Sequence, residues 1–242
     1  MKSANIHTFL YVLIHVIYTI FEWLYGALVI CFNFCHEFLP TTDKSKYFRE
    51  ELQKITKKPT HLTVIFGAEE PPFKELTNLI LWCLATQISF ISFYDYKGNL
   101  KKHEEQLQYE VGLQKNETDH ITWHSNPKIV HKNGYLGRSI HVKIITKEDG
   151  KNSIVNLTKK LAVFKNKDFS IENFSEMLLA QYEFPDPDVG LVCGQTIRLY
   201  DYPPWQMRIT EFFKLGSIQG ITFPKFLEVL VRYSKCEQRL GK

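Results

Sequence analysis

The end of the chain, CEQRLGK from Cys236 to Lys242, contains residues whose types and spacing suit the binding of an anion. The guanidinium of Arg239 presents a planar fork of N–H donors that matches a phosphate or a carboxylate. Gly241 has no side chain, so backbone N–H groups near it can approach an anion closely. From the residues alone, two interpretations stay open: an anion-binding tail, or the solvated basic end that is typical of C-termini.

A second candidate is the loop Gly67-Ala68-Glu69-Glu70, which follows the strand predicted at 61–67. Ligands of α/β proteins bind at the carboxyl ends of parallel strands, so this loop and those after Tyr94 and Val192 are the informative ones. Glu69 and Glu70 would repel a diphosphate unless a metal ion bridged them. The loop contains no aspartate and no basic residue.

Several motifs that would assign a common activity are missing. No GxGxxG or GxxxxGK[ST] run follows a predicted strand and no GxSxG run occurs, which argues against dinucleotide, P-loop and α/β-hydrolase chemistry. The nine histidines lack metal-ligand spacing, and the five cysteines form no CxxC pair, so neither a zinc site nor a disulfide framework is indicated. The net charge of +4 is spread along the chain without a dense basic run, which argues against nucleic acid as a partner.

The elements that must position these residues alternate between strands and helices. Strands are predicted at 61–67, 88–96, 120–125, 139–145 and 189–193, and helices at 75–87, 99–115, 152–164, 170–182, 205–215 and 223–238. Ser170 is the expected N-cap of its helix. The alternation predicts an α/β fold with a parallel central sheet of about six strands and helices on both faces.

Before this domain, the stretch from Ile6 to Phe34 is apolar except for one formal charge, Glu22. It exceeds the about 20 residues that span a bilayer and lacks a signal-peptidase site, so we expect a membrane anchor at 1–36 and a connector at 37–60. Glu22 would pair in an oligomer, or the segment would lie partly in the membrane interface.

The basic residues near the anchor stand mostly on its C-terminal side. They are Lys44, Lys46 and Arg49, against Lys2 on the other side. By the positive-inside rule this asymmetry favours a domain that faces the cytosol.

The run PDVGLVCGQTIRLYDYPPWQMRITE, which begins at Pro187, resembles the late signature of the cis-prenyltransferases, the undecaprenyl and dehydrodolichyl diphosphate synthase family. HLTVIFGAEE resembles the first strand and catalytic loop of that family, and IHVKIITKEDGKNSIVNLTKKLA resembles its strand–GGR–helix unit. The similarity covers 61–242, which implies a cis-prenyltransferase-like domain with the undecaprenyl diphosphate synthase-like fold. The N-terminal anchor and the ending CEQRLGK resemble the family's membrane-anchored, non-catalytic branch.

This chain departs from the family pattern at the catalytic positions. The family's aspartate, which binds Mg²⁺ and the allylic diphosphate, is missing from 67–70, and Val192 and Tyr200 replace its pyrophosphate-binding arginine and serine. Arg198 and Glu211 persist, Arg198 either as a weak substrate contact or as a structural residue. The resemblance therefore implies a chain that is inactive alone.

The resemblance also implies a role in a heteromeric complex on the endoplasmic reticulum membrane. A catalytic cis-prenyltransferase subunit would condense farnesyl diphosphate with isopentenyl diphosphate to make the dehydrodolichyl diphosphate that dolichol synthesis and protein glycosylation require. Arg239, Leu240 and Gly241 would contact isopentenyl diphosphate in that partner's active site, which would also hold the Mg²⁺; this chain would bind no metal. The expected partner-facing residues, on the helix predicted at 205–215, are Trp205, Gln206, Ile209, Phe212 and Phe213.

Two alternatives remain. The chain could be a self-sufficient homodimeric synthase in which Glu69 or Glu70 replaces the missing aspartate. It could instead be a membrane receptor or sterol-trafficking protein that reuses the fold for binding. Glycosylation of the sequons at Asn116, Asn156 and Asn173 would favour the second alternative, because it would place the domain in the lumen.

Overall fold

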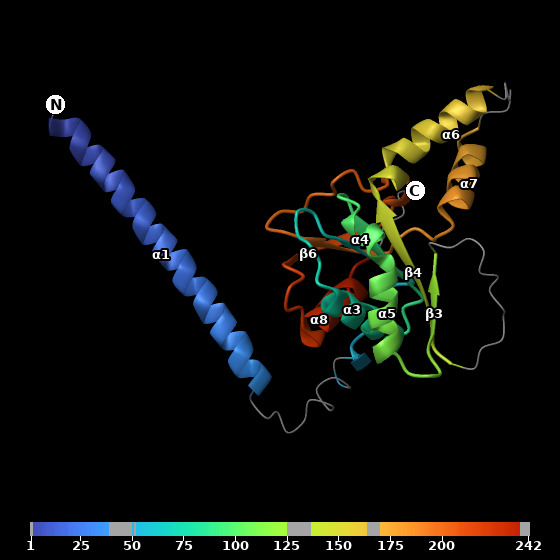
Figure 1. Ribbon diagram of the computed structural model, residues 1–242, viewed down its shortest axis with the longest axis horizontal. Coiled ribbons are helices and arrows are strands. Elements are labelled where there is room, and N and C mark those ends of the chain that lie inside the picture. Colours follow the sequence, from blue (N-terminus) through green and yellow to red (C-terminus); the bar gives the residue numbers. More distant parts are fainter. Residues whose placement is uncertain (1, 39–49, 51, 125–136, 164–169, 238–242) are drawn as a thin grey trace. The chain divides into compact units, whose positions relative to one another are not determined.

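The computed structural model describes residues 2–38, 50, 52–124, 137–163 and 170–237, and the chain divides into two compact units, Met1–Arg49 and Glu50–Lys242. The first unit contains one long helix, α1 (Lys2–Phe38), drawn in blue in Figure 1. Within α1, the segment Phe9–Gly26 is long and apolar enough to cross a membrane, and none of it is buried against protein.

The second unit is built on a six-stranded sheet in the order β3-β4-β2-β1-β5-β6, and all neighbouring strands run parallel. This confirms the predicted parallel α/β sheet. The strands are β1 (His61–Ile65), β2 (Phe90–Asp95), β3 (His120–Trp123), β4 (Ser139–Thr146), β5 (Val189–Cys193) and β6 (Glu211–Gly216).

The prediction of a helix at 205–215 is wrong. Only the short 3₁₀ turn η2 (Pro204–Gln206) forms there, and the chain then enters β6 beside β5. Alternate residues of this strand, Phe213 and Leu215, are buried. Pro203 and Pro204 favour a turn over a continuous helix, and aromatic residues favour a half-buried strand, so strand pairing outweighs the helical spacing of the apolar residues.

Helices cover the two faces of the sheet in the order that strand topology requires. The connections β1–β2 and β2–β3 advance in one direction and the connection β4–β5 returns, so right-handed crossovers place their helices on opposite faces. Figure 1 shows α6 and α7 as a helix pair that reaches beyond the sheet. The helices are α3 (Phe73–Ala85), α4 (Asn99–Lys102), α5 (Glu104–Gln114), the 3₁₀ turn η1 (Lys147–Asp149), α6 (Lys151–Val163), α7 (Ile171–Tyr182) and α8 (Phe223–Ser234).

Local sequence signals set several of these helix ends. The Ser170 hydroxyl accepts a hydrogen bond from the Asn173 N–H at 3.1 Å, which confirms the predicted N-cap of α7. On the α3 side of the sheet, α8 packs beside α3, where the ring of Trp82 lies 5.7 Å from that of Phe226. The C-terminal helix is therefore fixed to the domain directly before the tail.

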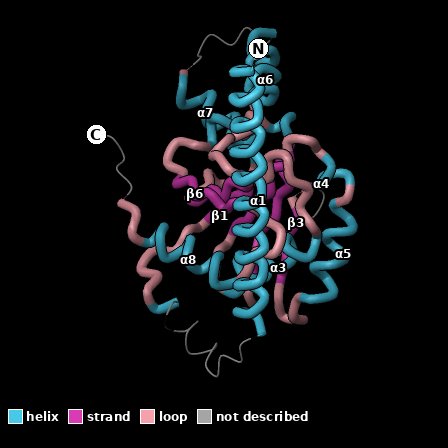
Figure 2. Tube along the Cα trace, turned by 90° about the vertical axis from the view of Figure 1, so that its left-hand side faces the viewer, coloured by secondary structure: helices cyan, strands magenta, loops and turns pink. Residues whose placement is uncertain are grey.

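The two faces of the central strands differ in chemistry. The face toward α3 is apolar, with Leu62 and Val64 of β1 fully buried. The opposite face carries polar and aromatic residues in register, with His61 beside Phe90 and Phe90 beside His141. Figure 2 shows the strands in magenta between the helices that cover them.

Candidate functional site

The loop after β1 is held by its own carboxylate. Glu69 Oε2 accepts hydrogen bonds from the backbone N–H of Ile218 at 3.0 Å and from the Ser217 hydroxyl at 3.2 Å. These bonds connect the loop after β1 to the loop after β6. Glu69 therefore serves as a structural acceptor that joins the two loops.

The carboxylate at the end of β2 is also engaged. Asp95 is buried and accepts hydrogen bonds from the backbone N–H groups of Leu100 at 2.7 Å and Lys97 at 2.9 Å. The Lys97 ammonium donates to the Ala68 carbonyl at 2.9 Å. A cavity of about 460 Å³ lies here, between Glu69, Glu70, Asp95, Lys97 and His103 among others, and its carboxylates make it a poor site for a diphosphate.

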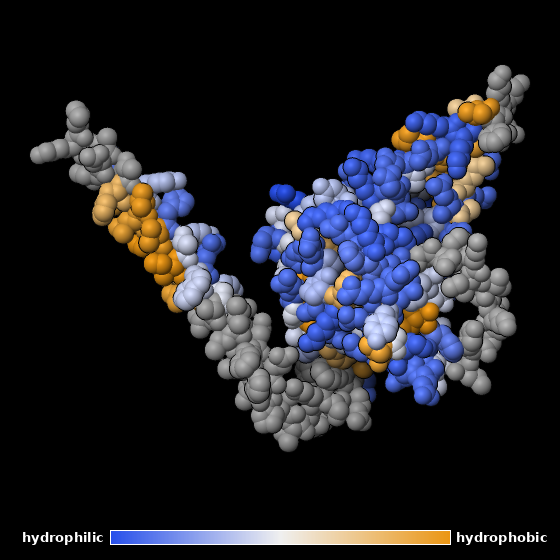
Figure 3. Space-filling view, viewed as in Figure 1, coloured by the Kyte–Doolittle hydropathy of each residue, from blue (hydrophilic) through white to orange (hydrophobic). Residues whose placement is uncertain are grey.

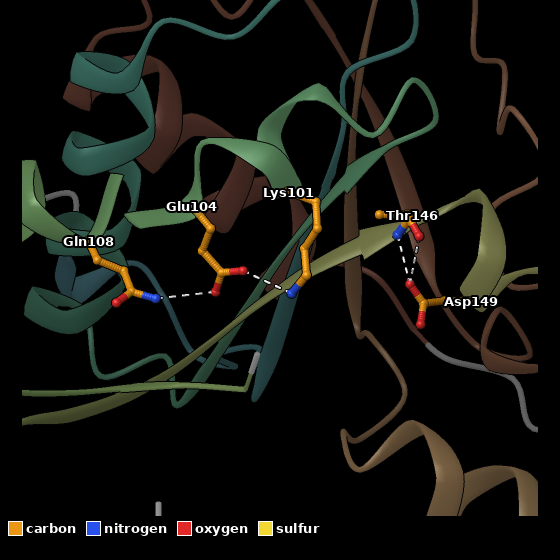
Figure 4. Close-up of polar contacts among 5 residues, drawn as sticks. All are labelled: Lys101, Glu104, Gln108, Thr146 and Asp149. Atoms are coloured by element: carbon orange, nitrogen blue, oxygen red, sulfur yellow. Dashed lines mark hydrogen bonds and ion pairs between the residues drawn. The ribbon is translucent and has the colours of Figure 1, made fainter. Parts of the chain in front are cut away.

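Acidic residues farther along this edge follow the same pattern (Figure 4). Asp149 Oδ2 accepts from the Thr146 N–H at 2.8 Å and so caps η1 at the end of β4. Glu104 forms an ion pair with Lys101 at 2.8 Å and accepts a hydrogen bond from Gln108 at 3.3 Å. These side chains stabilise the loops and helix ends at this edge.

The side chain of Tyr200 fills the space next to Gly67, in the loop after β1. Gly67 has a φ of +63°, and a Cβ there would lie 2.6 Å from the Tyr200 ring, so only glycine admits this contact. The same ring stacks on Tyr96 at 6.0 Å between centroids. Tyr200 itself has a φ of +49°, and its carbonyl accepts a hydrogen bond from Tyr94. Aromatic rings therefore occupy the place where a small polar residue would leave room for a ligand.

Val192 is fully buried in the apolar cluster that includes Ile65, Tyr94 and Tyr202. It has no group that could bind a phosphate, so the second predicted departure has a packing role. Among the described residues, no three His, Cys, Asp or Glu side chains are grouped so that they could hold a metal ion. On this edge Glu69 and Asp95 accept hydrogen bonds from backbone N–H groups, so this donor set does not fit a Mg²⁺ site.

The two persisting family positions lie apart from these contacts. Arg198 is exposed in the loop between β5 and η2, and Glu211 is half-buried at the start of β6. The Glu211 N–H donates to the Asp188 carbonyl at 2.9 Å, and in the described part of the chain no hydrogen bond joins the side chain of Arg198 or Glu211 to the loops at this edge.

The predicted partner-facing residues lie on η2, on β6 and on the link between them, which contains Ile209. Trp205 donates from its indole N–H to the Ser175 hydroxyl at 3.2 Å and packs edge-to-face on Phe174, so it fixes η2 to α7. Gln206 is buried, and Ile209 is 41% exposed. Of these three side chains, the Trp205 ring is half-buried, the Gln206 amide is buried and the Ile209 side chain is exposed.

The two phenylalanines of this set pack on different partners. Phe212 is half-buried against the apolar cluster, and Gly190 in the neighbouring strand leaves room for its ring. Phe213 is buried, and the Arg232 guanidinium of α8 lies 5.0 Å from the centroid of its ring.

The tail residues Arg239, Leu240 and Gly241 lie outside the described residues. The described chain reaches Glu237, just beyond α8, where the Cys236 N–H donates to the Tyr233 carbonyl at 2.9 Å. Tyr233 is buried, so the point from which the tail starts is fixed to the domain.

The sequence did not reveal the buried polar network that the His61 ring forms on this face of the sheet. Its Nδ1 lies 2.7 Å from the Pro185 carbonyl oxygen and its Nε2 lies 2.8 Å from the Ser92 hydroxyl. Burial lowers the pKa of His61 to about 3, so the ring is neutral at physiological pH. A histidine at the start of an apolar strand was the available signal, but it does not identify the partners.

A second missed feature is the exposed apolar surface of the α6–α7 pair. Its members are Val155, Val163, Ile171, Met177 and Leu179. Apolar residues on more than one side of each helix were the signal in the sequence. Trp205 packs on Phe174 of α7, so the predicted partner-facing segment contacts this helix pair.

No model of a known protein family matches the chain. The chain is 31% identical to dehydrodolichyl diphosphate synthase complex subunit NUS1 of Homo sapiens over 81% of this chain and 71% of that protein. It is 28% identical to the nus1 subunit of Schizosaccharomyces pombe over 91% of this chain and 90% of that protein. Among solved structures, a probable undecaprenyl diphosphate synthase of Campylobacter jejuni matches with a TM-score of 0.54 at 18% identity, over 77% of this chain and all of that one. The structural match confirms the predicted fold.

Proposed function

Because the chain belongs to the NUS1 (Nogo-B receptor) family of dehydrodolichyl diphosphate synthase complex subunits, we propose that it is the non-catalytic, activating and membrane-anchoring subunit of such a complex. The observation that carries this proposal is the similarity to complex subunits over most of both chains. The complex makes long-chain polyprenyl diphosphate from farnesyl and isopentenyl diphosphate, and the partner subunit carries out the condensation.

The geometry at the ends of the strands supports the division of labour. Prenyl transfer needs groups that hold and neutralise two diphosphates. In this chain Glu69 binds backbone, Val192 is buried in an apolar cluster, and the Tyr200 ring lies against Gly67. The Mg²⁺ that this chemistry requires would then be bound by the partner subunit, whose active site holds the diphosphates.

The tail supplies the contribution of this chain to the shared active site. Arg239 would donate its N–H groups to the phosphates of isopentenyl diphosphate, with Leu240 and Gly241 placing the backbone beside it. Arg198 would at most assist this contact, since it lies exposed on a different loop. The fixed end of α8 gives the tail a defined starting point, which reduces the conformational entropy that is lost when the tail binds.

The helix α1 anchors the complex in the endoplasmic reticulum membrane, with the domain in the cytosol. Its segment Phe9–Gly26 has the length and composition of a membrane span. Each added isoprene makes the product more apolar, so synthesis at the membrane delivers it directly into the lipid phase.

The surface for the catalytic partner comprises the exposed parts of the η2–β6 segment and the α6–α7 pair. Exposed apolar side chains are the groups that a partner protein can cover, and Ile209, Ile171 and Val163 are exposed on these segments. Trp205 and Phe212 are partly buried against the core clusters next to this surface. Gln206 and Phe213 are too buried to contribute much contact area themselves.

The proposal is tested by co-expressing the chain with a catalytic cis-prenyltransferase subunit and by purifying each protein separately. With Mg²⁺, farnesyl diphosphate and isopentenyl diphosphate, the pair is expected to make polyprenyl diphosphate and this chain alone to make none. Robust turnover by the chain alone would support the homodimeric synthase instead. Full activity of the catalytic subunit without this chain would contradict the proposal that this chain activates it.

A further inference from the structure

The helix α1 carries its polar-tipped side chains in a regular stripe. Its members are Tyr11, His15, Tyr18, Glu22 and Tyr25, and successive members are four, three, four and three residues apart. This alternation is the spacing of the a and d positions of a coiled coil, which keeps one seam of a helix facing a neighbouring helix. The seam lies within the segment that can span the membrane.

Contacts along the seam tie its members to one another. The Tyr18 hydroxyl donates a hydrogen bond to Glu22 Oε1 at 2.9 Å, and the rings of Tyr11 and His15 lie 4.6 Å apart. Figure 3 shows strongly hydrophobic residues along one side of α1 and paler or hydrophilic residues along the other. The helix therefore has one side suited to lipid and one side that is not.

In the hydrocarbon core of a bilayer, polar and ionisable side chains face other helices or water-filled cavities rather than lipid tails. In α1, Tyr11, Tyr18 and Tyr25 are each at least 60% exposed, and Glu22 is exposed as well. Within the described residues α1 is the single helix that could span a membrane, so no other described helix can cover the seam, whereas a helix of a second molecule can.

We propose that the seam of α1 is a pairing surface for α1 of a second copy of this chain, so that two complexes are joined within the membrane. The inference rests on the proposed membrane insertion of α1. Two copies inserted in the same direction are parallel, which brings each seam residue next to its equivalent or to its neighbour one turn away.

The seam is complementary to itself, which favours a second copy over a different helix. The tyrosine hydroxyls and the histidine ring offer hydrogen-bond donors, and the Glu22 carboxyl group offers acceptors. The hydrogen bond from Tyr18 engages Oε1 of this carboxyl group, and a carboxyl group has two oxygens that can accept hydrogen bonds. A heptad seam also selects close pairing of two helices over random contact in the bilayer.

The experiment uses the full chain with its catalytic partner subunit in phosphatidylcholine vesicles. Two populations of the chain, one with a donor and one with an acceptor fluorophore at the N-terminus, report association by energy transfer as the protein-to-lipid ratio is varied. Tyr18→Phe with Glu22→Leu removes two seam groups. Trp23→Leu is the matched control, because residue 23 follows Glu22 but points about 100° away around the helix.

We expect concentration-dependent transfer for the wild type and the control, and association about tenfold weaker for the seam variant, given about threefold for each interhelical polar contact. Retention of every variant in the vesicles at alkaline pH tests insertion separately. Chains that alkaline buffer extracts would overturn both the membrane role and the pairing. Embedded chains without transfer above random mixing, or equal transfer in the seam variant, would overturn the pairing alone. Transfer that disappears when the catalytic subunit is left out would also overturn it and would assign the seam to that partner.

Discussion

The replacement of His61 by asparagine tests the buried polar network under the sheet. His61 is fully buried, and its ring nitrogens lie 2.7 Å from the Pro185 carbonyl oxygen and 2.8 Å from the Ser92 hydroxyl. Burial lowers the pKa of this ring to about 3, although hydrogen bonds to the backbone at Pro185 and Asp186 oppose the shift. In the unfolded chain a histidine titrates near about 6.5.

The sign of the pH dependence follows from these two values. Between about pH 6.5 and pH 3 the unfolded chain binds one more proton at this residue than the folded chain, so stability falls as the pH is lowered. The contribution is fully present above about pH 6.5. At pH 5, about 1.5 pH units below the unfolded pKa, the loss amounts to about 2 kcal/mol.

The assay is urea unfolding of the full chain in detergent micelles at pH 7.5 and pH 5.0, followed by tryptophan fluorescence. The wild type is expected to lose about 2 kcal/mol more than His61→Asn between the two pH values, whatever the stability of the variant at pH 7.5. If both proteins lost the same free energy of unfolding, the reasoning about a neutral buried His61 would be refuted.

Two further predictions concern packing and partner binding. Gly190→Ala places a Cβ 2.4 Å from Cδ1 of Phe212, so we expect a loss of about 1–3 kcal/mol in urea unfolding, whereas Gly112→Ala, with open space around its Cβ in α5, is expected to be neutral or stabilising. A loss at Gly190 no larger than at Gly112 would contradict the strand contact. Ile209→Arg is expected to weaken co-purification with the catalytic subunit about tenfold or more, while Ile197→Arg, a similarly exposed isoleucine on another loop, leaves it unchanged. Equal binding by both arginine variants would remove Ile209 from the interface.

The sequence predicted the strands because their runs are short, apolar and bounded by turn residues. The same reasoning failed at 205–215, where Trp205, Ile209 and Phe212 have helical spacing. The pairing of β6 with β5 outweighs that local pattern. This pairing depends on residues outside the segment itself. Spacing within one segment therefore could not identify the last strand.

The candidate site was predictable only in part for the same reason. The missing aspartate is visible in the loop sequence, and Val192 is apolar on inspection. The ring of Tyr200 against Gly67, and the engagement of Glu69 by the loop after β6, join segments more than a hundred residues apart. No local signal marks such contacts. The role of Arg239 was predicted from resemblance and stays a prediction.

The measurement that tests the central claim most directly is the steady-state kinetics of the complex with Arg239→Ala, beside Lys235→Ala, which removes an equal charge from the end of α8. The account predicts intact assembly for both. For Arg239→Ala alone it predicts kcat/KM for isopentenyl diphosphate about ten- to a hundredfold lower, from the loss of about 1.5–3 kcal/mol at a charged phosphate contact. A complex with Arg239→Ala as active as the wild type would contradict the claim that this chain completes its partner's active site.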